Sequence, residues 1–195
     1  MVPKPNYDGL ASELADALTL HYRAWIAEHR DDEIYAYIIY SGSLVNSFTI
    51  SVLSEKGLRQ VAAQYQDKYK GKPKYARKTL EQWADELRWS VADSPYCGDN
   101  DEVFASINNR LGGMVPYSDS LDVDDPAWDE HIETLYSMLV SALNEFRAKA
   151  LGGAKRPLLY VDFGDMSDEE RLWFIERCND PESVEWYNSQ STGNT

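Results

Sequence analysis

Apolar residues in the first part of the chain follow two different periods, and each period predicts one kind of element. From about Asp8 to His29 they recur at helical spacing, which places them on one face of a helix. Nearly every residue of Glu33–Tyr40 is apolar or aromatic, which is typical of a central strand covered on both faces. Over Leu44–Leu53 apolar and polar residues alternate, so we expect a strand with one partly solvated face. The turn formers at positions 41–43 join the two strands and predict an antiparallel hairpin.

The middle of the chain carries helix signals separated by polar breaks. Ser54 is a typical N-cap residue and predicts a helix over Glu55–Tyr69. The segment Thr79–Glu86 also has a helical pattern. It leads into Leu87–Tyr96 (LRWSVADSPY), which we interpret as an apolar and aromatic strand that breaks at its Asp-Ser-Pro turn. A further helix is expected over Glu102–Leu111.

The last part of the chain has strong start and stop signals. An Asp-Pro pair at 125–126 predicts the start of a long helix, and the glycines at 152–153 predict its end. Leu158–Phe163 has the composition of a buried strand. The helix expected over Ser167–Cys178 opens with a capping box, and a short helix carrying Trp186 follows it.

These elements predict one α+β domain, in which a mainly antiparallel sheet carries several amphipathic helices packed on it. The domain covers residues 7–187. It lies between a flexible N-terminus, residues 1–6, and a flexible C-terminal tail, residues 188–195. A chain of 195 residues has the usual size of a single domain with a substantial core.

Net charge narrows the choice of partners. The chain has 33 acidic and 19 basic residues, a net charge of -14. Binding of nucleic acid or of an anionic membrane needs a basic face, so we predict neither. A strongly acidic chain is suited to a basic protein partner, because opposite charges speed the encounter.

One short stretch has the opposite charge. Between positions 68 and 78 it contains the basic residues Lys68, Lys70, Lys72, Lys74, Arg77 and Lys78, interleaved with Tyr69 and Tyr75. Basic segments with aromatic residues can bind phosphates or nucleic acid. In so acidic a chain we favour a solvated loop. A second interpretation is that it pairs within the chain with the acidic loop Pro116–Asp125.

The sequence also predicts a compartment. The N-terminus has no apolar stretch typical of a signal peptide, and no apolar run is long enough to span a bilayer. Neither Cys97 nor Cys178 belongs to a CxxC pair. We therefore expect a cytoplasmic protein with both thiols reduced.

No catalytic motif stands out. His21, His29 and His131 belong to no recognisable nucleophile–base arrangement. The triplet at 162–164 matches the metal-binding DFG of protein kinases, but the other kinase motifs are missing. The acidic loop at 116–125 lacks the spacing of an EF-hand. We predict no catalytic residue, no metal and no cofactor.

A polar site near the Leu87–Tyr96 stretch is the alternative to that prediction. On a strand, Arg88 and Trp89 would point to opposite faces. Arg88, Asp93 and Tyr96 could then form a small site at a sheet edge, joined by Asp162 in the hypothesis of a small enzyme. The more ordinary interpretation is a strand end followed by a helix entry.

Three segments resemble an uncharacterised bacterial family, a domain of unknown function of about this length. They are the YAYIIY strand after a long amphipathic helix, RWSVADSPY before a helix with Phe104, and LLYVDFGDMS followed by ERLWFIERCNDPESVEW. The resemblance extends from the first helix to Trp186. Members of the family resemble genes near polymorphic-toxin loci. The resemblance therefore implies an immunity role and implies no particular activity.

Three functions remain open. The favoured one is an immunity-type binding module that neutralises a toxin domain by direct binding. Its predicted contact surface consists of acidic residues: Asp119, Asp122, Asp124, Asp125, Asp129 and Glu130. The second is an adaptor or structural subunit, dimeric through Trp and Tyr surfaces. The third is a small enzyme at the polar site described above, which would require a deep pocket.

Overall fold

The computed structural model describes residues 2–42, 45–152 and 157–191. Its centre is a three-stranded sheet in the order β2-β1-β3, with β1 over Ile34–Ser41, β2 over Phe48–Ser54 and β3 over Leu158–Asp162. β1 pairs antiparallel with β2 and parallel with β3. The predicted α+β domain is confirmed, and its sheet is mixed because the last strand reaches β1 through a long helical connection. The central, doubly covered strand Glu33–Tyr40 is confirmed as β1.

The hairpin between β1 and β2 is also confirmed, with a later start for its second strand. β2 begins at Phe48, while Ser43 and Leu44 lie outside the described residues. One face of β2 is less solvated than the alternation predicts, because Ser51 is fully buried. Its hydroxyl donates to the carbonyl of Val91 at 2.8 Å, so the loop that contains Val91 covers this face of β2.

Two long helices pack against each other on one face of the sheet. They are α1, Leu10–Glu28, and α6, Pro126–Ala150. Tyr37 of β1 joins them: its hydroxyl lies 2.8 Å from Nδ1 of His21 in α1, and its ring lies 5.2 Å from that of Phe146 in α6. The start of α6 at the Asp-Pro pair is confirmed, whereas Gly153 at its predicted end lies outside the described residues.

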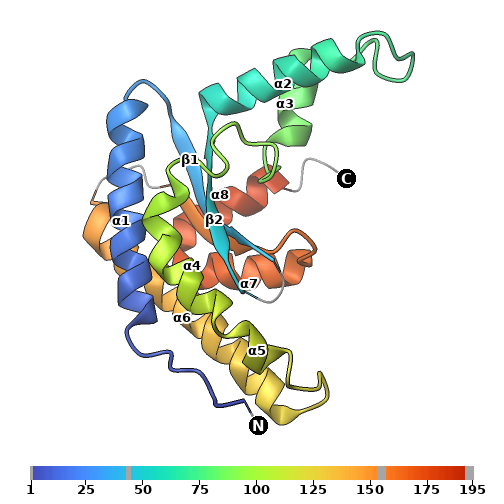
Figure 1. Cartoon of the computed structure of the whole chain (residues 1–195). Helices are drawn as coiled ribbons and strands as arrows, with labels where there is room; N and C mark the ends of the chain where they lie inside the picture. Colours follow the sequence, from blue (N-terminus) through green and yellow to red (C-terminus); the bar gives the residue numbers. More distant parts are fainter. Residues whose placement is uncertain (1, 43–44, 153–156, 192–195) are drawn as a thin grey trace.

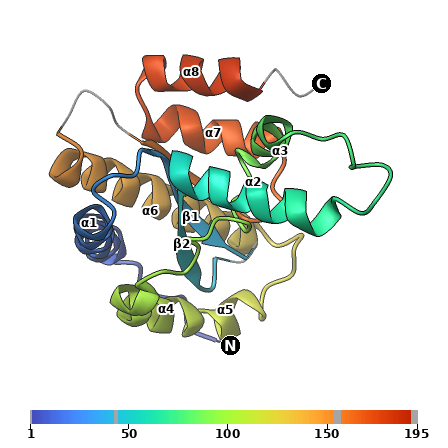
Figure 2. The same ribbon diagram turned by 90° about the horizontal axis from the view of Figure 1, so that it is seen from above.

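Shorter helices complete the body of the molecule. α7, Asp168–Cys178, packs directly on β3, and α8, Pro181–Ser191, packs on α7. A 3-10 helix, Asp101–Phe104, leads into α4, Ala105–Gly112, and the single turn α5, Val115–Ser118, follows. In Figure 2, α7 and α8 lie on one side of the strands, and α4 and α5 lie on the other.

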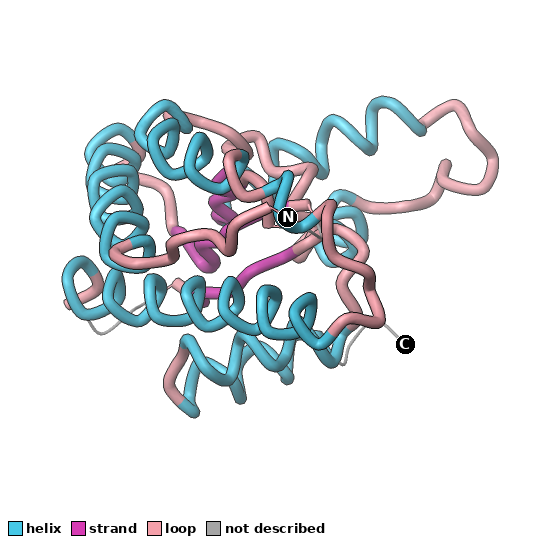
Figure 3. The backbone as a smooth tube through the Cα atoms, turned by 60° about the horizontal axis from the view of Figure 1, so that its bottom comes forward, coloured by secondary structure: helices cyan, strands magenta, loops and turns pink. Residues whose placement is uncertain are grey.

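The pair α2, Glu55–Tyr69, and α3, Leu80–Leu87, projects away from this body together with its connecting loop (Figure 1; Figure 3). Both helices are confirmed, and so is the predicted Ser54 cap of α2; the structure adds a cap for α3 that was not predicted. The Ser54 hydroxyl accepts a hydrogen bond from the Gly57 N–H at 3.1 Å, and Thr79 forms a capping box with Gln82.

The strand predicted over Leu87–Tyr96 is wrong. Leu87 ends α3, and the segment at 88–100 forms turns, with one isolated antiparallel bridge between Cys97 and Ser51. The apolar residues that suggested a strand are covered without one: Leu87 and Trp89 are half-buried against the core, and Val91 is buried in the loop. Arg88 therefore lies over the ring of Tyr35, and Trp89 packs against Tyr187, instead of facing opposite sides of a sheet.

Three boundaries also differ. The acidic loop expected from Pro116 begins as α5, and the helix expected from Glu102 begins with a 3-10 turn at Asp101. α8 continues through the first residues of the predicted tail, 188–191, and positions 192–195 lie outside the described residues. At the other end, positions 2–6 form no regular element, and Met1 is outside the described residues. No helix in the described ranges is both long and apolar enough to cross a membrane.

Candidate functional site

The predicted polar site does not assemble. Arg88 and Asp93 lie beside α2, where Arg88 pairs with Glu55 at 2.9 Å and Asp93 accepts hydrogen bonds from the hydroxyls of Tyr65 and Ser90. Each side chain therefore has a structural partner of its own.

The other two members of that site are also engaged elsewhere. The hydroxyl of Tyr96 donates to Asp32 at 3.1 Å. Asp162 ends β3 opposite Tyr40, whereas the backbone carbonyl of Arg88 accepts a hydrogen bond from the hydroxyl of Tyr35 at the start of β1. Tyr40 lies five positions after Tyr35 along β1, a distance of about 17 Å. Arg88 and Asp162 cannot act on one small substrate.

The cavity beside Asp93 is too small for a substrate. It is lined by Asp93 and Pro95 among others and has a volume of about 10 Å³, which is room for a single water molecule. Packing is so tight here that a Cβ atom added to Gly57 would lie 2.9 Å from the Tyr96 ring. The enzyme hypothesis required a deep pocket, and this cavity does not provide one.

Asp162 serves the structure as the polar end of β3. Its carboxylate accepts hydrogen bonds from the N–H of Gly164 at 2.7 Å and from Nε of Arg171 at 3.1 Å. Gly164 has a φ of 76°, which glycine adopts easily. Within the described residues, no three His, Cys, Asp or Glu side chains converge to hold a metal ion.

His131 has a serine neighbour and therefore resembles a catalytic base at first sight. Its Nδ1 lies 2.5 Å from the hydroxyl of Tyr7, and its Nε2 lies 2.8 Å from the hydroxyl of Ser118. Burial raises the pKa of Tyr7 to about 12, so its hydroxyl stays protonated. Both ring nitrogens of His131 are engaged by hydroxyl groups, and His131 and Ser118 are both buried, so this pair is not placed to attack a substrate. Burial also lowers the pKa of His131, which keeps this histidine neutral.

The six predicted partner-binding residues are all exposed and lie on one segment, residues 119–130, which we call the acidic end. It follows α5 and forms the first turn of α6. Asp125 caps α6 by accepting from the N–H of Ala127 at 2.9 Å, and Glu130 pairs with Lys4 at 2.8 Å. No cation in the described chain pairs with the remaining four carboxylates: Asp119, Asp122, Asp124 and Asp129.

The projecting helical pair forms a second charged region, residues 65–83, which we call the basic arm. Its small core is aromatic: the Trp83 side chain is buried and contacts the rings of Tyr65, Tyr69 and Tyr75. Trp83 stacks on Tyr69 with ring centroids 5.6 Å apart, and Nζ of Lys78 lies 3.9 Å from the Trp83 centroid on the ring face. The arm is therefore an ordered unit with a core of its own, and not simply the solvated loop that we favoured.

The cations of the arm do not pair with the acidic loop as our second interpretation proposed. That interpretation is wrong because the arm and the acidic end lie at opposite ends of the molecule (Figure 1). The ion pairs of the arm are local, between Lys70 and Asp67 and between Lys78 and Glu86. The sequence signals of an ordered arm were the Thr79 cap and the tyrosines at helical spacing before it.

The fold and these two regions define an α+β domain with charge of opposite sign at its two ends. A family model described as "Domain of unknown function (DUF4303)" matches residues 14–190, so the chain belongs to this family. The resemblance to an uncharacterised family is thereby confirmed. No curated protein and no solved structure matches the chain.

Proposed function

We propose that this chain is an immunity-type binding module that neutralises a basic toxin domain by direct binding through its acidic end. The observation that supports this proposal is the group of four exposed carboxylates without a cation partner. Val123 lies among them with 68% of its surface exposed, so the segment combines negative charge with an apolar contact point.

The acidic end is also held in place, which reduces the entropy lost on binding. α6 is anchored by core residues such as Leu139 and Phe146, both fully buried. The Asp125 cap and the ion pair between Lys4 and Glu130 hold its first turn. A basic partner would therefore bind carboxylates that need little rearrangement on binding.

We place this activity in the cytoplasm. Cys97 and Cys178 are both free in the structure, which fits a compartment that keeps thiols reduced. Burial raises the pKa of the Cys178 thiol to about 12, so this cysteine is unreactive.

The test begins with the partner. A tagged chain is used to isolate a stoichiometric basic protein from the native cell at low and high salt, and the purified pair is then studied by stopped-flow kinetics. Neutralising three charges, Asp122→Asn, Asp124→Asn and Asp129→Asn, should slow association about tenfold at low salt and flatten its salt dependence. Dissociation should change less, because exposed charges act mainly on the encounter.

The matched control neutralises three exposed carboxylates on α7 and α8: Glu176→Gln, Glu182→Gln and Glu185→Gln. It removes the same total charge from a different face and should leave association nearly unchanged. Equal association rates in the two triple variants would show that the acidic end is not the contact surface.

The apolar self-interface expected of a structural subunit gains no support from the described surface. Its large exposed hydrophobic residues, Val2, Leu20, Val123 and Trp186, belong to four separate segments. Scattered apolar residues of this kind are normal for a protein surface. Association between copies would need another driving force.

A further inference from the structure

The basic arm differs in charge from everything around it. Residues 67–78 contain six basic side chains and one carboxylate, Asp67. Because the whole chain has a net charge of -14, the remainder without this segment has a net charge of -19. Most cations of the arm are exposed, among them Lys72, Lys74 and Arg77. A concentrated positive patch on so negative a protein attracts an anionic surface.

The described rings of the arm are largely occupied by one another and leave little aromatic face of the kind on which single-stranded nucleic acid stacks. Lysines also lie over the tyrosines: Lys72 lies 4.7 Å from the Tyr69 ring centroid and Lys74 lies 5.3 Å from that of Tyr75. Bases need an open aromatic face on which to stack. A long polyanion bound to the arm would also run along the acidic body. The chemistry of the arm therefore favours carboxylates on a compact protein surface.

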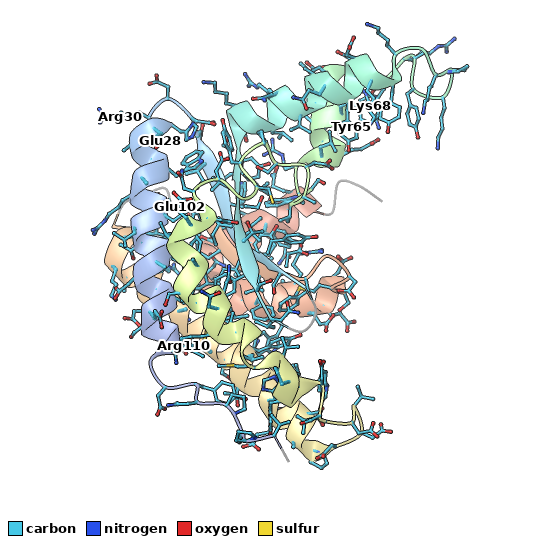
Figure 4. All side chains as sticks on the ribbon, viewed as in Figure 1. Glu28, Arg30, Tyr65, Lys68, Glu102 and Arg110 are labelled. Atoms are coloured by element: carbon cyan, nitrogen blue, oxygen red, sulfur yellow. The ribbon has the colours of Figure 1, made fainter. Side chains whose placement is uncertain are left out.

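A carboxylate surface of this kind is present on the chain itself, out of reach of its own arm. In Figure 1 the arm projects at one end of the molecule, and α5 with the start of α6 lies at the other end, toward the same side. Figure 4 shows Tyr65 and Lys68 on the arm, well away from the sheet. A two-fold rotation between two copies would bring each arm to the acidic end of the other copy.

We propose that two copies of this chain form a reciprocal dimer in which the basic arm of each docks on the acidic end of the other. The projection of the arm is what permits this, because it carries positive charge to the partner while holding the two acidic bodies apart. Repulsion between the bodies is screened over a Debye length of about 10 Å at 0.1 M salt, whereas the docked charges are in contact. Both contacts form together, so each makes the other intramolecular.

The dimer does not depend on the proposed function, since it requires only the chain itself. It does affect that function if both hold, because the acidic end is covered in the dimer and a toxin domain would have to displace the arm. The two proposals are tested separately: one with purified chain alone, the other with the isolated partner.

The first experiment is sedimentation velocity of the purified chain at about 50 mM and about 500 mM salt. We expect a dimer at low salt and a monomer at high salt. An arm-reversed variant, Lys72→Glu, Lys74→Glu and Arg77→Glu, should be monomeric at both. An end-reversed variant, Asp122→Lys, Asp124→Lys and Asp129→Lys, should also be monomeric at both.

An equimolar mixture of the two variants gives the sharpest result. The negative arm of one variant matches the positive end of the other, and the two remaining surfaces also match. We therefore expect the mixture to dimerise although neither variant does so alone. Restored dimerisation, with circular dichroism spectra like those of the natural chain, rules out misfolding as the cause of the loss.

The control variant, Glu176→Lys, Glu182→Lys and Glu185→Lys, has the same net charge as the end-reversed variant and should remain a dimer at low salt. A monomeric natural chain at low salt overturns the proposal, as does a dimer that persists in both reversed variants. Binding of a fluorescent RNA oligonucleotide through the arm by a chain that stays monomeric would also overturn it, in favour of a nucleic-acid site.

Discussion

The body of this protein and its basic arm are stabilised in different ways. In the body, Phe146 of α6 contacts Tyr22 of α1 and Tyr37 of β1, which lie more than a hundred positions away in the chain. In the arm, Trp83 contacts Tyr65 and Tyr75, which are near neighbours in sequence. The body is therefore cooperative over the whole chain, whereas the arm is a local unit attached to it.

The two regions also differ in the sign of their charge. The surface of the body holds most of the carboxylates, since the chain without residues 67–78 has a net charge of -19. The arm has so small a core that its lysines lie on the outside, over aromatic rings and in solvent. Positive charge is therefore concentrated in the unit that contributes least to the shared core.

The largest expected effect is on the body. Phe146→Ala removes a fully buried ring and leaves a cavity between α1, α6 and β1, which should lower the free energy of unfolding by about 3–5 kcal/mol. Chemical denaturation followed by circular dichroism measures this loss. Lys74→Ala on the arm is the comparison and should stay within about 0.5 kcal/mol of the natural chain. Similar losses in the two variants would remove the distinction between body and arm.

Trp83→Ala tests whether the arm is a local unit. We expect amide hydrogen exchange to accelerate across residues 65–83 and to remain slow in β1 and β3, because the arm opens while the body stays folded. The loss in global free energy of unfolding should be smaller than that for Phe146→Ala. Faster exchange throughout the sheet would mean that arm and body unfold as one.

Acidification should act on the body through its buried histidines. Burial lowers the pKa of both His21 and His131, so the unfolded chain binds a proton more readily than the folded one. Stability is then fully present above the unfolded pKa of about 6.5. It falls as the pH drops below that value, by at most about 1.4 kcal/mol per histidine for each pH unit.

The measurement is the denaturant midpoint at several pH values between about 7.5 and 5.5. His131→Asn should show a shallower decrease than the natural chain, whatever its starting stability. The groups around His131 are Tyr7, Tyr117, Ser118 and Lys4. Burial raises the pKa of Tyr7, and the hydrogen bond to Glu130 raises that of Lys4, so neither titrates in this window. An unchanged slope would mean that His131 is not held neutral by the fold.

The smallest expected effect compares one capping box in each region. Ser167 caps α7 in the body, and Thr79 caps α3 in the arm; each hydroxyl accepts from an N–H at 3.2 Å. Replacing either residue by Ala should cost about 1 kcal/mol. Ser167→Ala should lower the global free energy of unfolding, whereas Thr79→Ala should appear mainly as faster hydrogen exchange in the arm. A global loss of stability in Thr79→Ala, with only local changes in Ser167→Ala, would contradict the proposed independence of the arm.

The polar site illustrates where prediction from sequence failed. Arg88, Asp93 and Tyr96 lie within one turn-rich segment, so their proximity was predictable, but their partners were not. Glu55 and Tyr65 come from α2 and Asp32 comes from the loop before β1, and only packing brings them to these side chains. The strand predicted there failed for a related reason, because Leu87 packs from the end of a helix and Val91 is buried in a loop.

The sequence by itself determined the elements whose signals are local. The caps at Ser54, Ser167 and Asp125, and the unbroken apolar run of β1, depend on residues a few positions apart. They predicted α2, α7, α6 and β1 at nearly their observed limits. The tertiary structure decided which distant segments meet: the parallel pairing of β3 with β1, the loop that covers β2, and the separation of the basic arm from the acidic end. Those features depend on how long helices pack across the sheet, and no local pattern of residues specifies that packing.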